Sequence, residues 1–179
     1  MAEIIKELNS IQGKTSALFI MKAEGLQGGL EQTIKLFTGK KMSGACICLN
    51  KSYKTLKAQL ESKKINTKNL LFIDALTGNK NEAKTSENVV LVSNPAELTS
   101  ISLAAVSFAK GNKGNKFIVI DALSTLLIYN QANSIAKFIM KIISLTTSDD
   151  LSLVVLTTES KGSTLINKIE PFFDRIARV

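Results

Sequence analysis

Short apolar runs rich in β-branched residues alternate with amphipathic stretches along the whole 179-residue chain. This alternation is typical of βα units, in which helices connect and cover the strands of a parallel sheet. Most of the runs are apolar at consecutive positions, which predicts strands buried on both faces. We therefore predict an α/β fold with strands at residues 17–21, 45–49, 70–73, 89–92, 117–120, 151–156 and 175–179.

Apolar residues at helical spacing predict helices between these strands. The clearest repeat covers residues 98–108 and follows Asn94, Pro95 and Glu97, which predict an N-cap, a first-turn proline and a capping-box glutamate. The length suits one domain over residues 1–179. Further apolar stripes predict helices within residues 30–37, 53–60 and 132–143, and a short one within residues 1–15 before the first strand.

Composition and local pattern exclude several classes of protein. No apolar run reaches the ~18 uninterrupted residues of a membrane span, and the N-terminal residues lack the pattern of a signal peptide, so we expect a cytoplasmic protein without a membrane partner. Cys46 and Cys48 lie two positions apart on a predicted strand, and the chain has no His, which argues against a zinc site. We predict that both cysteines are buried and reduced.

The net charge favours an anionic partner. Lys and Arg outnumber Asp and Glu by 23 to 15, a formal charge of +8. The lysines are scattered along the sequence and do not alternate with aromatic residues, as they often do in nucleic-acid-binding chains. We interpret the excess as a diffuse, solvated surface, with nucleic-acid binding as the alternative.

One internal similarity concerns two predicted strands. The stretch 71–77 (LFIDALT) resembles 118–124 (IVIDALS), and both place an aspartate, Asp74 or Asp121, at the carboxyl end of a buried strand. Ligands of open parallel sheets bind at that edge, so the two carboxylates are candidates for one shared crevice. The alternative is that each aspartate only caps a following helix or turn.

Several stretches together resemble the RecA/KaiC superfamily of P-loop ATPases, specifically the small stand-alone KaiC-like domains common in archaea. They are residues 46–53, 72–75, 117–124, 156–159 and 171–174. The resemblance runs from about Ser16 to Val179 and implies a RecA-like three-layer α/β/α sandwich with a mainly parallel central sheet. It places Asp121 in the Walker B position, followed by Ser124 and Thr125.

The same resemblance implies a Walker A loop after the first strand, where glycines, a Lys and a Ser/Thr hold phosphate and Mg²⁺. Residues 21–32 (MKAEGLQGGLEQ) keep glycines that we expect to form a turn, but no Gly-Lys-Ser/Thr follows them. Glu24 and Glu31 would place negative charge where a triphosphate lies. The motif is therefore degenerate, and the predicted vestigial nucleotide site consists of Gly25, Gly28, Gly29, Asp121 and Ser124.

Other requirements of an ATPase are missing as well. Asn50 and Lys51 stand where KaiC-like ATPases carry acidic residues, and neither an amide nor an ammonium group can act as the general base. The Gly13-Lys14-Thr15 stretch precedes the first strand, so it does not form a strand-to-helix phosphate loop. Asp121 could hold Mg²⁺ only if substrate phosphates supplied further ligands, and we interpret it as a structural relic. No catalytic residue is predicted.

These points favour a non-catalytic RecA/KaiC-like domain that acts as a regulatory or protein-interaction module, without a cofactor and with a protein partner or its own copy. One alternative is a nucleic-acid-binding accessory protein, as among recombinase relatives. The other is an atypical ATP-binding protein in which Lys22 replaces the Walker lysine and Asp74 or Asp121 holds Mg²⁺.

Overall fold

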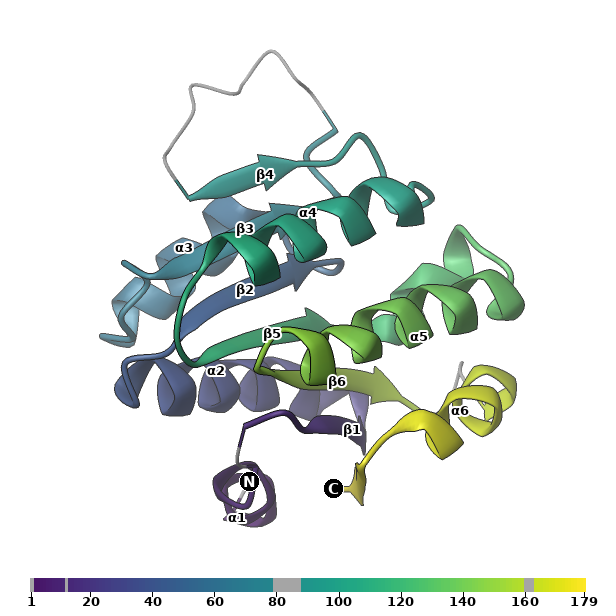
Figure 1. Cartoon of the computed structure of the whole chain (residues 1–179), viewed down its shortest axis with the longest axis horizontal. Helices are drawn as coiled ribbons and strands as arrows, with labels where there is room; N and C mark the ends of the chain where they lie inside the picture. The colour runs from purple at the N-terminus through teal and green to yellow at the C-terminus, as the bar shows by residue number, and fades with distance from the viewer. Residues whose placement is uncertain (1, 12, 79–87, 160–162) are drawn as a thin grey trace.

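The computed structural model describes residues 2–11, 13–78, 88–159 and 163–179, and its centre is one parallel sheet (Figure 1). The strand order is β4-β3-β2-β5-β6-β1-β7, and every described pairing is parallel. This confirms the α/β class and all seven predicted strands. They are β1 (Ser16–Met21), β2 (Ser43–Cys48), β3 (Leu70–Asp74), β4 (Val89–Leu91), β5 (Lys116–Asp121), β6 (Leu151–Thr158) and β7 (Arg175–Arg178).

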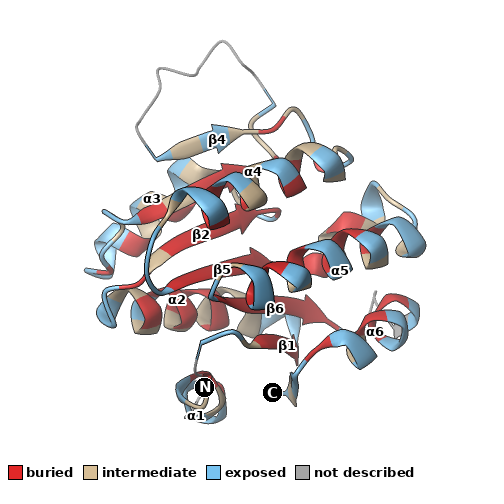
Figure 2. Cartoon of the chain, in the orientation of Figure 1, coloured by how far each residue is buried: buried red, intermediate tan, exposed pale blue. Residues whose placement is uncertain are grey.

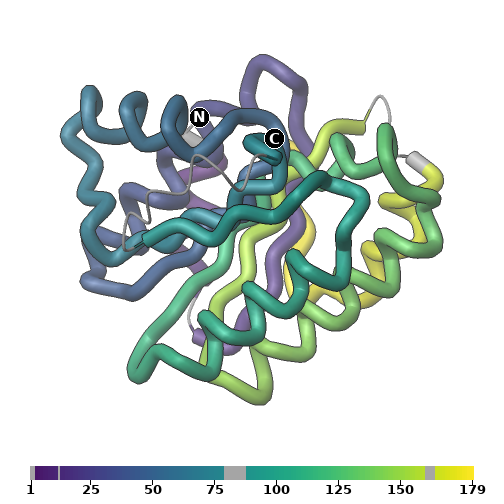
Figure 3. The backbone as a smooth tube through the Cα atoms, turned by 90° about the horizontal axis from the view of Figure 1, so that it is seen from above, coloured from purple at the N-terminus to yellow at the C-terminus, as the bar shows by residue number. Residues whose placement is uncertain are grey.

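Helices cover both faces of the sheet and give the predicted three layers. The α-helices are α1 (Ala2–Asn9), α2 (Ala23–Gly39), α3 (Tyr53–Ser62), α4 (Leu98–Gly111), α5 (Ala132–Ser148) and α6 (Ser163–Ile169), with 3₁₀ segments η2 (Leu123–Ile128) and η3 (Glu170–Phe172). Helices α1, α2 and α3 pack on one face, and α4, α5 and α6 on the other. Viewed from above, α4 and α5 lie on one side of the strands and α3 on the other (Figure 3).

Two of these segments were not predicted. The η2 residues continue the apolar run of β5 without a polar break, so composition does not mark where the strand ends. Helix α6 has only seven residues, too few for a helical period to stand out.

The strands alternate their side chains between two apolar cores. On β5, Ile118 and Ile120 face α4 and α5, whereas Phe117 and Val119 face α2, and all four are fully buried. Figure 2 shows the central strands buried along their length, while the helices are buried only on the side that faces the sheet. Burial of such a side chain stabilises the fold by about 1.5–3 kcal/mol, which explains why the strands are apolar at consecutive positions.

Cys46 and Cys48 lie in the core beneath α2 and α3. Both are free thiols with no exposed surface, and their Sγ atoms are 4.0 Å apart. The hydrogen bond with Cys48, together with burial, raises the pKa of the Cys46 thiol well above its usual value. The prediction of buried, reduced cysteines is confirmed.

The predicted capping box of α4 is wrong. The helix begins at Leu98, and Glu97 occupies the N-cap position without a side-chain cap. Asn94 Oδ1 instead accepts a hydrogen bond from the Ala96 N–H at 2.8 Å, and Asn94 O accepts one from the Glu97 N–H at 3.2 Å. Asn94 therefore closes a separate turn in front of the helix, because that turn uses the residues that a capping box would need.

The predicted polar loop at residues 77–88 lies largely outside the described residues, which omit 79–87. Within the described residues, no helix combines the length and apolar character needed to cross a bilayer.

Candidate functional site

The candidate site lies at the carboxyl edge of the sheet, where the central strands β3, β2 and β5 end side by side. Cys48 of β2 is in register with Asp74 on one side and with Asp121 on the other. Because residues in register on parallel strands project to the same face, both aspartates point to the side covered by α2 and α3. The sequence similarity thus corresponds to equivalent positions in the sheet.

Asp74 is fully buried and hydrogen-bonded through both oxygens. Oδ1 accepts from the N–H groups of Leu76 at 2.8 Å and Thr77 at 3.1 Å. Oδ2 accepts from the Tyr53 N–H at 2.9 Å and from Thr77 Oγ1 at 2.5 Å. The carboxylate therefore fixes the start of α3 and the turn after β3. The hypotheses that it shares a crevice with Asp121 or holds a metal are wrong, because no solvent or free lone pair reaches it.

Asp121 has a different environment, although it is only 4% exposed. Its Oδ1 accepts a long hydrogen bond of 3.4 Å from Asn50 Nδ2, and Asn50 Oδ1 accepts one of 2.5 Å from Thr125 Oγ1. Burial raises the pKa of Asp121 to about 6, against the opposing effects of the Asn50 hydrogen bonds and the positive charge of Lys51. Asp121, Asn50 and Thr125 form one polar cluster around a carboxyl group with few donors.

The backbone turns sharply directly after Asp121. Ala122 adopts φ +57° and ψ +79°, a left-handed conformation that costs a non-glycine residue about 1–2 kcal/mol. This turn carries the chain straight into η2. The Ser124 hydroxyl then lies 3.0 Å from Thr158 Oγ1 on β6. The structure therefore does not bring Ser124 to Asp121, as the predicted nucleotide site required.

The connection from β1 to α2 is a single residue. Strand β1 ends at Met21 and α2 begins at Ala23, with Lys22 between them. The expected glycine turn is therefore wrong, because Gly25, Gly28 and Gly29 all lie inside α2. Two observations explain this: the buried side chains of α2 recur at helical spacing, and Gly29 packs so closely on Met21 that an added Cβ would lie 3.1 Å from its Cε.

A pocket of about 620 Å³ opens beside this connection, at the carboxyl ends of β1, β6 and β7. Its charged lining consists of Lys22 and Arg178 with Glu24 and Glu159. The expected negative charge is thus present at Glu24. At Glu31 the expectation is wrong, because that side chain is buried and pairs with Lys63 Nζ at 2.6 Å. None of the five residues predicted for a nucleotide site lines the pocket.

The remaining candidates fall elsewhere or do not assemble a metal site. Lys14 of the Gly13-Lys14-Thr15 stretch pairs with Asp150 at 2.8 Å, before β1 and β6, so it lies at the opposite edge of the sheet. Among the described residues, no group of three or more acidic, Cys or His side chains could hold a metal ion.

The sequence reasoning missed the contact between Asn50 and Asp121. Asn50 follows Cys48 by two positions, and residues two positions apart on an extended chain project to the same face. That spacing, together with the parallel order of β2 and β5, was the signal that could have paired Asn50 with Asp121.

Comparison with protein-family models identifies one family. A family of unknown function (DUF7090) matches residues 3–179. The chain belongs to the DUF7090 family. Among curated proteins, no sequence matches this DUF7090 chain.

Solved structures similar to this DUF7090 chain share the RecA/KaiC-like fold. An uncharacterized protein, PH0321 from Pyrococcus horikoshii in complex with an unknown peptide, has a TM-score of 0.75 and 9% identity over 99% of this chain and 82% of its own. The KaiC-like protein PH0186 from the hyperthermophilic archaeon Pyrococcus horikoshii OT3 gives 0.66 and 11%, over 94% and 72%. A third structure, an ATPase domain, gives 0.65 and 11%, over 97% and 73%. Identities this low establish the fold.

Proposed function

We propose that this chain is a non-catalytic domain with a RecA/KaiC-like fold that acts as a protein-interaction module. We further propose that its Walker A segment is degenerate and that it is related to the KaiC-like domains of archaea. The observation that carries the proposal is the connection from β1 to α2 through Lys22 only.

A phosphate-binding loop works because several backbone N–H groups between strand and helix converge on the phosphates. Here the strand and the helix are too close for such a loop. Gly28 and Gly29 lie beyond the first turn of α2, where the helix itself uses the N–H groups. The glycines therefore supply no free donors, and Glu24 adds like charge at the helix start.

The chemistry of phosphoryl transfer also lacks its participants. Asn50 is an amide hydrogen-bonded to Asp121 and Thr125, so it cannot accept a proton from water. Mg²⁺ prefers several oxygen ligands in octahedral geometry, and Asp121 offers one carboxyl group that is covered by protein and whose pKa of about 6 favours the neutral form in mild acid. The described residues around Asp121 do not fit a resident Mg²⁺ ion.

Exposed apolar side chains near the same edge support a protein partner. Ile128 is 68% exposed and the adjacent Tyr129 is 47% exposed, where η2 ends. Adjacent aliphatic and aromatic side chains of this kind are frequent anchors of protein interfaces. The likeness to PH0321, which was solved with an unknown peptide, supports a segment of another polypeptide as the ligand.

A thermal-shift titration with ATP, ADP and GTP in the presence of Mg²⁺ tests the non-catalytic part. We expect no change in Tm, whereas a nucleotide at 100 times its Kd would add about 2.7 kcal/mol to the stability. The matched variants are Asp121→Asn and Lys22→Gln. A rise in Tm that either variant abolishes would overturn the proposal and assign a nucleotide site to this edge.

Sedimentation of the purified chain at micromolar concentration tests the interaction part for self-association. We expect a concentration-dependent rise in mass that Ile128→Ser removes. The control is Leu103→Ser on α4, since Leu103 is 57% exposed on another surface. Equal behaviour of the two variants would contradict an interface at Ile128.

A further inference from the structure

Six exposed lysines gather at the amino edge of the sheet, opposite the candidate site. Two lie in each of the segments that lead into the adjacent strands β2, β3 and β5. We call this surface the lysine edge: Lys40 and Lys41, Lys64 and Lys68, and Lys110 and Lys113.

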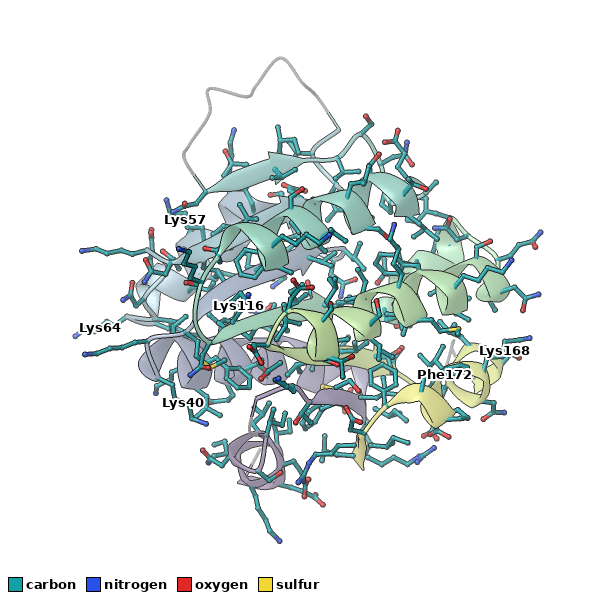
Figure 4. The ribbon with its side chains drawn as sticks, viewed as in Figure 1. Lys40, Lys57, Lys64, Lys116, Lys168 and Phe172 are labelled. Atoms are coloured by element: carbon teal, nitrogen blue, oxygen red, sulfur yellow. The ribbon has the colours of Figure 1, made fainter. Side chains whose placement is uncertain are left out.

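Backbone hydrogen bonds join the three segments directly. The Ser43 N–H donates to Asn115 O at 3.3 Å, and the Gly44 N–H donates to Asn69 O at 2.9 Å. Figure 4 shows Lys40 and Lys64 projecting from the same side of the molecule, with Lys168 at the opposite end. The interpretation of the positive charge as diffuse is therefore wrong, because segments far apart in the sequence meet at one edge.

Nearby acidic residues do not neutralise the lysine edge. Their ion pairs are with other lysines: Glu61 with Lys57 at 3.9 Å, Glu31 with Lys63 at 2.6 Å, and Asp150 with Lys14 at 2.8 Å. In the described ranges, no ion pair involves the six lysines.

Helix ends offset only part of this charge. Helices α2, α3 and α4 end close to these segments, and each C-terminus carries roughly half a negative charge, so together they offset about 1.5 of six positive charges. Lys116 already serves one of these ends, because its buried Nζ donates to Ala109 O at 2.8 Å and to Asn112 O at 2.9 Å. A net positive surface remains.

We propose that the lysine edge binds the phosphate backbone of a nucleic-acid duplex. The apolar side chains of the segments, Met42 and Ile65, are buried, and the large exposed apolar side chains of the described residues lie elsewhere. A protein interface needs such anchors, whereas phosphates need cations and amide donors. The segments supply both, since Asn66, Asn69 and Asn115 are exposed beside the lysines.

The absence of exposed aromatic residues from these segments decides between double and single strands. Proteins that hold unpaired bases stack them on aromatic side chains. Tyr and Phe are absent from residues 40–43, 63–69 and 110–115. Contacts to phosphate alone also carry no base information, so the proposal specifies sequence-independent binding. It does not depend on the proposed protein-interaction function, which concerns the other edge.

Fluorescence anisotropy with two unrelated 20-base-pair DNA duplexes tests the proposal. We expect equal affinity for both and a linear fall of log K with log salt concentration, with a slope of up to about −5 if all six lysines contact phosphates. Polyglutamate serves as a competitor. No binding at ~50 mM salt, or competition by polyglutamate at equal charge concentration, would overturn the proposal; the second result would indicate an acidic protein.

A pair of charge-matched variants locates the surface. Lys40→Gln, Lys68→Gln and Lys113→Gln together should lower the affinity at least tenfold and reduce the salt slope by about three. Lys137→Gln, Lys141→Gln and Lys168→Gln, on α5 and α6, should leave both unchanged. Equal weakening by the two triple variants would contradict a defined surface. If the first triple variant lowers Tm, Lys113→Gln should still reduce the slope by about one.

Discussion

Asp74 and Asp121 occupy matching positions of two similar segments, yet their carboxyl groups have opposite surroundings. Asp74 accepts four hydrogen bonds of 2.5–3.1 Å, three of them from backbone N–H groups. Asp121 accepts one of 3.4 Å from a side chain, and burial raises its pKa to about 6. Position at the end of a strand therefore does not determine what a carboxylate does.

The turn after each aspartate explains the difference. After Asp74 the chain folds back, and the hydroxyl of Thr77 closes onto the carboxylate. After Asp121 the left-handed Ala122 directs the chain away, and Ser124, the counterpart of Thr77, turns to Thr158 on β6. One carboxylate is thereby built into the fold, whereas the other keeps unused hydrogen-bonding capacity.

The largest expected effect is that of Asp74→Ala. It leaves three buried N–H groups without their acceptor, and each costs about 1–3 kcal/mol, so we expect a loss of roughly 3–5 kcal/mol in urea unfolding. Asp74→Asn keeps one acceptor oxygen and should lose less. A loss below about 1 kcal/mol for Asp74→Ala would show that water replaces the carboxylate.

For Asp121→Asn we expect a gain in stability that depends on pH. The folded pKa of about 6 exceeds the ordinary value of 3.8, so the native state binds more protons between these values and the wild type loses stability as pH rises through that window. The loss amounts to about 3 kcal/mol at pH 7. The variant should be more stable than the wild type at pH 7 by up to that amount and within about 1 kcal/mol of it at pH 4.

Urea unfolding of both proteins between pH 4 and pH 8 measures this difference. Glu3→Gln, an exposed change in α1, controls for the altered net charge. A difference that does not vary with pH would contradict the raised pKa of Asp121.

Asn50→Leu should raise the pKa of Asp121 further, because it removes the side-chain donor at 3.4 Å. The expected change in stability at pH 7 is about 1 kcal/mol or less, since Asn50 is exposed. Titration of the Asp121 carboxyl carbon by NMR gives the pKa directly. Asn66→Leu, also exposed, should leave it unchanged, and a lower pKa in Asn50→Leu would contradict the assigned donor.

The smallest effect is expected for Ala122→Gly. Relief of the left-handed backbone offsets the lost methyl group and the greater freedom of the unfolded chain, so stability should change by less than about 1 kcal/mol. The buried Ala75 follows Asp74 without a positive φ, so Ala75→Gly should lose about 1 kcal/mol or more. Thermal unfolding of the two variants side by side makes the test, and equal losses would show that Ala122 is not strained.

The strands were predictable because burial on both faces leaves a direct record in composition, as at residues 117–120. The β1–α2 connection was not predictable by analogy with a phosphate loop. Gly25, Gly28 and Gly29 suggested a turn, but the spacing of Leu30, Ile34 and the other buried side chains keeps them helical. A glycine tolerates a turn without requiring one.

The candidate site and the lysine edge were harder to predict because both depend on strand order. The order β3-β2-β5 brings Asn50 to Asp121 at one end of the sheet and joins three lysine-bearing segments at the other. Periodicity identifies a strand but does not say which strand lies beside it. Two strand-end aspartates could therefore be found in the sequence, and their different partners could not.

The place of β1 between β6 and β7 has a consequence for how the chain is made. Ser16 pairs with Leu153 and Ala17 with Arg175, so the first strand obtains both neighbours only from the last part of the chain. At about 5–20 residues per second, a ribosome needs roughly 7–30 s to proceed from Met21 to Leu151. For that time the apolar segment SALFIM has no strand to pair with, and non-local pairing of this kind makes folding slow. Newly made chains should therefore depend on chaperones at β1 more than at any later strand.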